Sequence, residues 1–170
     1  MEKQLKEQGW NLSEEGLKLC KDLISDSNNM TATKIISVAL NQDLRHIADK
    51  YLPENINSGH VKTIDGPIVV QLQKIRNITA PMMNQDSQGS PRMLKLNLTD
   101  GNTHCVAVEF ENIPCLKASM IPGTKLCITG KNVVVSHGVI FLEKENLKLL
   151  GGQVDKLKEK WEASKSLKKK

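Results

Sequence analysis

The sequence predicts an α+β protein, in which a small three-helix bundle precedes a small five-stranded barrel and a C-terminal helix. Up to residue 52, apolar residues recur at spacings of three and four, the period of an amphipathic helix. From Pro67 to Leu150, apolar and polar residues alternate, as they do in half-buried strands. After Gly151-Gly152 the helical spacing returns with Val154, Leu157 and Trp161, which predicts a helix that packs back on the body.

Three helices are expected in the first 52 residues, and each begins at a residue whose side chain can cap it. The predicted N-caps are Ser13, Thr31 and Asp43, and the third helix should run from Leu44 to Leu52, before Pro53. About 50 residues form only a marginally stable unit, so we expect this bundle to lean on the segment that follows.

Five strands are expected in the second part of the chain. Their ranges are 68–76, 93–99, 104–110, 125–136 and 139–150, the last with a break near Glu145. Turn sequences such as Asp100-Gly101 separate them, and a long connection lies between the third and the fourth. This arrangement indicates a Greek-key barrel of the OB type. The predicted domains are therefore residues 1–60 (helical), 61–152 (barrel, with an insertion loop at 78–91) and 153–170 (basic helix and tail).

The polar stretch from Asn77 to Arg92 separates two strands that should pair. A tight hairpin needs only about 2 to 5 loop residues, whereas this stretch has about 15. A small β-domain that carries so long a loop is expected to use it.

Composition places the net charge of +5 mainly in the C-terminal tail. Residues 155–170 contain seven lysines and three acidic residues, which leaves the body of the chain nearly neutral. We favour a solvated helix end as the interpretation of this tail over a binding element, and any contact with nucleic acid would be weak or indirect. No apolar run is long enough for a membrane span, and the N-terminus lacks a secretory signal. We expect an intracellular protein of the nucleus and cytoplasm.

Motifs for catalysis are missing from the sequence. It has no phosphate loop, no nucleophile elbow and no zinc-protease helix, so we expect no enzyme, no catalytic residue and no cofactor. The four cysteines form no Cys-x-x-Cys pair and are expected to be buried thiols rather than metal ligands.

Two functions remain for such a barrel. OB folds often bind single-stranded nucleic acid through a basic groove and stacking aromatics, but only Phe110 and Phe141 lie in this barrel, and its strands are not notably basic. The alternative is a scaffold. Val133–Val135 and Val139–Leu142 are apolar on both faces, so the C-terminal helix or a partner must cover one face. Two other interpretations remain open, namely that these runs pack within the molecule and that the insertion loop is disordered.

The candidate contact residues follow from the strand period. Val106, Val108 and Phe110 share one face of the third strand, and Val139 and Phe141 share one face of the fifth. The pattern does not say which face is outward. At its start the loop carries apolar residues suited to protein contacts, namely Ile78, Pro81, Met82 and Met83.

Several strings in the chain resemble the N-terminal region of the RecQ-mediated genome instability protein family and its Tudor domain-containing relatives. In the barrel these are residues 66–77, 91–101, 122–125 and 149–155, and before the barrel Gly9-Trp10, 41–45, 51–53 and 56–59. Glu159-Lys160-Trp161 in the C-terminal helix also matches, so the resemblance covers nearly the whole chain.

The resemblance implies a helical domain and an OB fold that dock on a type IA topoisomerase, here topoisomerase III beta, without catalysing a reaction. It favours Val108 and Val139 as contacts, and it implies that the insertion loop reaches the enzyme's gate and tunes strand passage. With the loop residues, the expected partner-binding set is Val106, Val108, Phe110, Val139, Phe141, Ile78, Pro81, Met82, Met83 and Arg92.

Overall fold

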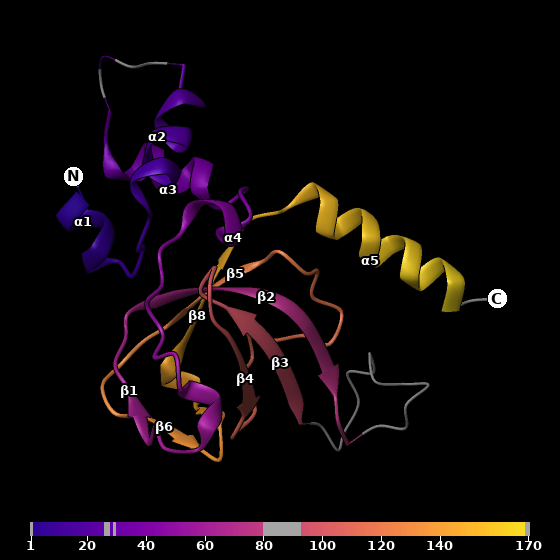
Figure 1. The fold of residues 1–170 in the computed structure, drawn as a ribbon. Coiled ribbons are helices and arrows are strands. Elements are labelled where there is room, and N and C mark those ends of the chain that lie inside the picture. Colours follow the sequence, from indigo (N-terminus) through magenta and orange to yellow (C-terminus); the bar gives the residue numbers. More distant parts are fainter. Residues whose placement is uncertain (1, 26–27, 29, 80–92, 169–170) are drawn as a thin grey trace.

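A computed structural model describes residues 2–25, 28, 30–79 and 93–168. Figure 1 shows the N-terminal helices gathered at one end of a curled sheet, with the C-terminal helix projecting to the side. The fold is therefore α+β with an OB-like barrel, as predicted. None of the described helices is long and apolar enough to cross a membrane.

The helices before the barrel are α1 (Glu2–Glu7), α2 (Glu14–Asp22), α3 (Ala32–Ala39) and α4 (Leu44–Ile47). All three predicted N-caps are confirmed. The side chain of Ser13 accepts from the Gly16 N–H, that of Thr31 from the Lys34 N–H, and that of Asp43 from the Arg45 N–H.

The prediction of three helices was wrong in two respects. The short helix α1 was not expected, and it is fixed by its one buried side chain, Leu5. The third predicted helix ends at Ile47 instead of Leu52, because Ala48 is already extended and pairs with Leu12. Beyond it, the backbone N–H groups of Tyr51 and Leu52 donate to the carboxylate of Asp100, a tertiary contact that replaces helical hydrogen bonds.

The described strands are eight in number, not five. They are β1 (Thr63–Ile64), β2 (Ile68–Asn77), β3 (Leu94–Thr99), β4 (His104–Glu109), β5 (Lys125–Ile128), β6 (Val133–Ser136), β7 (Val139–Leu142) and β8 (Leu147–Gly151). The first three predicted strands lie within a residue of β2, β3 and β4. Each of the last two is broken into a pair. Gly130 and Asn132, both at positive φ, separate β5 from β6, and a 3₁₀ turn at Lys144–Asn146 separates β7 from β8.

The sheet has the order β1-β6-β7-β4-β3-β2-β5-β8. Along the chain β5 continues into β6 and β7 continues into β8, so these four strands form the two arms of one long hairpin. The hairpin supplies the pair β6-β7 near one end of the order and the pair β5-β8 at the other end, so the sheet curls round on itself. The pairing of β4 with β7 is parallel, and the other pairings are antiparallel.

Two apolar cores meet at the junction of helices and barrel. The helical core includes Val69 of β2 and Cys127 of β5, whereas Leu52 and Ile56, which precede the barrel, belong to the barrel core. Each part therefore buries apolar side chains of the other, which supplies the support that a bundle of this size needs.

The C-terminal helix α5 (Asp155–Lys168) does not pack back on the body as the sequence predicted. Val154, just before it, is buried, but Figure 1 shows the helix itself running away from both helices and barrel. Trp161 is half-buried, and the ammonium of Lys165 lies 4.1 Å from its ring centroid, so a neighbour on the same helix shields it.

Candidate partner-binding face

The outward surface of the barrel is set by alternation along β3, β4 and β7. Leu94, Leu96 and Leu98 of β3 enter the barrel core, so Lys95 and Asn97 face outward. On β4, Cys105 and Ala107 point inward, and on β7 Ile140 and Leu142 do. Val106 and Val108 of β4 and Val139 and Phe141 of β7 alternate with these inward residues. They therefore lie on the outer face, where each is half-buried.

The strand register joins these outward residues into one patch. In the parallel pair, Val106 is opposite Val139, and Val108 is opposite Phe141. Phe110, just past the end of β4, is 64% exposed, and its ring meets that of Phe141 edge to face at a centroid distance of 5.9 Å. We call Val106, Val108, Phe110, Val139 and Phe141 the apolar patch. The described chain leaves it partly open to solvent, although single exposed apolar residues elsewhere on the surface are ordinary.

An open groove of about 460 Å³ borders this patch. Three amide side chains line it, those of Asn57, Gln73 and Asn97, together with Leu98, His104, Cys105 and Val106. Gln73 lies where the register of β2 against β3 shifts between Leu72 and Lys74, a β-bulge that re-aims a side chain. The groove can thus offer hydrogen bonds beside the apolar surface.

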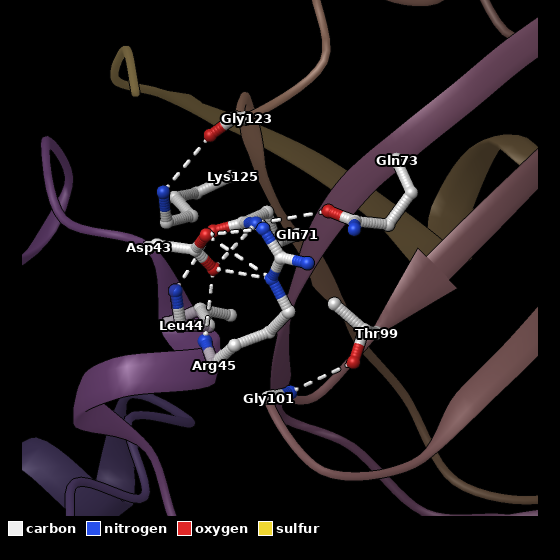
Figure 2. A network of polar contacts seen from close by, with 9 residues as sticks. All are labelled: Asp43, Leu44, Arg45, Gln71, Gln73, Thr99, Gly101, Gly123 and Lys125. Atoms are coloured by element: carbon white, nitrogen blue, oxygen red, sulfur yellow. Dashed lines mark hydrogen bonds and ion pairs between the residues drawn. The ribbon is translucent and has the colours of Figure 1, made fainter. Parts of the chain in front are cut away.

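The helices cover the other end of the same outer face. Figure 2 shows how Gln71 of β2 links the two parts: its carbonyl accepts from the Leu44 N–H at 2.9 Å, and its amide donates to Asp43 at 3.0 Å. Arg45 adds an ion pair and hydrogen bonds to the Asp43 carboxylate, the shortest at 2.6 Å. These contacts fix α4 on the barrel and so define where the open part of the face begins.

Lys125 of β5 is fully buried beside this network, at 0% exposure. Its ammonium donates to the carbonyl of Gly123 at 2.9 Å and to that of Leu40, at the end of α3, at 3.2 Å. Burial lowers the pKa of Lys125 to about 8, against the attraction of Asp43. Burial would raise the pKa of Asp43, but hydrogen bonds from Arg45 and Gln71 outweigh it and lower that pKa to about 2.

The structure brings together five of the ten predicted contact residues, those of the apolar patch. Ile78 is not among these five; it follows β2 directly, its N–H donates to the Met93 carbonyl, and it is 41% exposed. Pro81, Met82, Met83 and Arg92 lie outside the described residues. Of the predicted runs, Val133 and Val135 are buried and Val134 is exposed on β6.

Sequence reasoning missed the polar network and also the charges on the outer face. Asp43 was expected only as a cap, and Lys125 was not singled out. A signal existed for Gln71, a polar residue inside the apolar run from Ile68 to Leu72. The burial of Lys125 has no local signature, because the carbonyl of Leu40 comes from a distant part of the chain. The described residues contain no group of three His, Cys, Asp or Glu side chains placed to hold a metal.

These observations define a class: an OB-fold protein whose helices occupy one end of the outer sheet face and leave an apolar patch open at the other. Residues 52–165 match the family model described as the RMI1 N-terminal OB-fold domain, so the chain belongs to that family. The resemblance seen in the sequence is thereby confirmed.

Curated relatives agree with this assignment. The chain is 43% identical, over 162 residues, to Tudor domain-containing protein 3 of Danio rerio, a match that covers 95% of this chain and 22% of that protein. It is 46% identical over 135 residues to Tudor domain-containing protein 3 of Xenopus tropicalis, covering 79% of this chain and 19% of that protein. It is 33% identical over 174 residues to RecQ-mediated genome instability protein 1 of Mus musculus, a match that covers 84% of this chain and 28% of that protein. The chain thus spans less than a third of these relatives.

Proposed function

We propose that this chain is a non-catalytic accessory module that binds a type IA topoisomerase, topoisomerase III beta, through the outer face of its OB fold. The observation that carries the proposal is the apolar patch, in which valine and phenylalanine side chains of two paired strands lie together and partly open to solvent. Burying such a patch against a partner is favourable, and its aromatic residues are of the kind that dominate interface energies. The identity of the partner comes from the family resemblance.

A binding role suits the chain better than a catalytic one because the sequence carries no catalytic motif. An accessory module of an enzyme that works on nucleic acids would act in the nucleus and cytoplasm. The insertion loop at 78–91 is proposed to reach the gate of the topoisomerase and tune strand passage. That part of the proposal rests on sequence and resemblance, since residues 80–92 lie outside the described residues.

The competing function is binding of single-stranded nucleic acid by the same face. Such binding depends on flat aromatic rings on which bases stack, at about 1–3 kcal/mol per base. Here Phe110 and Phe141 are paired edge to face with each other, and the rest of the patch is valine. Aliphatic side chains pack against protein better than they stack on bases, so the patch favours a protein partner.

Aspartate placed on the patch tests the proposal directly. Val108→Asp and Val139→Asp should each weaken binding of purified topoisomerase III beta by about 2 kcal/mol or more, roughly 30-fold in Kd. The matched control is Leu149→Asp, because Leu149 is also an exposed apolar residue of the barrel but lies on β8, which pairs with β5 and with no strand of the patch. Binding is measured by calorimetry or biolayer interferometry, and circular dichroism checks the fold.

Wild-type affinity in both patch variants would refute the proposal. If both variants instead lose affinity for a single-stranded oligonucleotide and keep the topoisomerase, the competing function is correct. For the loop, replacing residues 80–90 with a two-residue turn should leave most of the affinity and change topoisomerase turnover. Loss of affinity at unchanged turnover would make the loop a simple docking element.

A further inference from the structure

The outer face carries a second feature beside the apolar patch, a group of three cations on β2 and β3. Ile75 packs toward the barrel core, so its neighbours Lys74 and Arg76 face outward. Arg76 is directly opposite Lys95, and Lys95 is directly opposite Val108 of the patch. Lys74 is opposite Asn97, which in turn is opposite Val106. We call Lys74, Arg76 and Lys95 the basic row.

The barrel does not balance these charges within the described part of the chain. The ion pairs there are Arg45 with Asp43 and Lys50 with Glu54, and neither involves the basic row. Arg76 and Lys95 are half-buried cross-strand neighbours, and like charges in this position destabilise a sheet. Glu109 of β4 is buried, and its carboxylate accepts from the N–H groups of Leu94 and Ile113.

We propose that the basic row receives an acidic segment of the protein partner that docks on the apolar patch. This inference rests on the proposed function and adds to it the charge and the orientation of the partner. The two halves of the face are continuous, because Lys95 stands directly between Arg76 and Val108 in the register. A bound protein therefore meets β4 and β7 with apolar side chains and meets β2 and β3 with carboxylates.

The chemistry of the row suits carboxylates. A guanidinium can bind a carboxylate through two parallel hydrogen bonds, and the partly buried position of Arg76 limits screening by salt. Complementary charge of this kind acts mainly on the rate of association, which then falls as salt rises. The apolar patch should act mainly on dissociation. The two contributions are therefore separable by kinetics.

The test uses the double variant Arg76→Glu/Lys95→Glu and measures association with topoisomerase III beta at low and at high salt. We expect the association rate to fall at least about tenfold at low salt, with much of the difference lost at high salt. The matched control is Lys62→Glu/Lys131→Glu, which makes the same change of charge at two exposed positions outside β2, β3, β4 and β7. The single variant Lys95→Glu, which replaces the Arg76–Lys95 repulsion by an attraction, should fold at least as stably as the wild type.

The outcomes distinguish this inference from the proposed function. Val108→Asp is measured in parallel: if it loses binding while the double charge variant keeps the wild-type rate at every salt concentration, the acidic-segment inference is wrong and the proposed function stands. If Val108→Asp also binds normally, the proposed function itself fails. If the double variant loses a single-stranded oligonucleotide and keeps the topoisomerase, the row binds phosphates and not carboxylates, which also overturns the inference.

Discussion

Replacing Lys125 with methionine tests the charge that the fold buries between helices and barrel. Methionine has a similar length and fills the same space without a charge. The pKa of Lys125 is about 8 in the folded chain, against 10.5 for an exposed lysine. Between these two values the unfolded chain binds more protons than the folded chain, so the contribution of Lys125 to stability rises with pH.

The magnitude follows from those two pKa values. At pH 7 both states are largely protonated, and burial of the charge opposes folding by roughly 3 kcal/mol. At pH 9 the folded chain has largely lost this proton while the unfolded chain keeps it, and the penalty falls to about 2 kcal/mol. Between pH 7 and pH 9, the free energy of unfolding of the wild type should therefore rise by about 1 kcal/mol relative to that of Lys125→Met. The neutral amine can still donate to the carbonyls of Leu40 and Gly123.

Urea unfolding at several pH values measures this gain as a difference between the two proteins. The difference matters because burial raises the pKa of Cys20 to about 11 and that of Cys105 to about 12, and both thiols favour unfolding as pH rises above about 9. Both proteins contain these thiols, so the contribution of the thiols cancels when the two free energies of unfolding are subtracted. Lys131→Met, at an exposed lysine, is the control and should show no such gain. A constant gap between wild type and Lys125→Met from pH 7 to pH 9 would refute the reasoning.

Two further substitutions test the packing of the helical part. Asp100→Ala should lower the free energy of unfolding by about 3 kcal/mol or more, because the carboxylate accepts from the N–H groups of Tyr51, Leu52, Asn102 and Thr103. Asp100→Asn keeps one acceptor oxygen and should lose less, and equal losses in denaturant titrations would contradict this account. Gly16→Ala would normally strengthen a helix by up to about 1 kcal/mol, but here a Cβ would overlap the Ile47 carbonyl, so we expect a loss of about 1–3 kcal/mol by thermal melting. A rise in melting temperature would show that α2 and α4 can move apart, and Lys18→Ala on the exposed side of α2 is the control.

The sequence alone determined the features that depend on neighbours along the chain. The caps at Ser13, Thr31 and Asp43 were readable because a capping side chain bonds to a backbone N–H two or three residues away. The change of period near Pro67 located the barrel, because side chains alternate along any strand whatever its partner. The candidate residues of the apolar patch came from the same alternation.

The tertiary structure decided everything that depends on pairing between distant segments. Period alone leaves both the register and the outward face of a strand undefined, and these place Lys95 between Arg76 and Val108. The third predicted helix ended at Ile47 because Ala48 is extended and pairs with Leu12, while Asp100, far along the chain, accepts from the later N–H groups of Tyr51 and Leu52. The burial of Lys125 depends on the Leu40 carbonyl, which accepts a hydrogen bond from its ammonium across the junction of helices and barrel. Such contacts have no local signature, since each is fixed only when the two segments pack together.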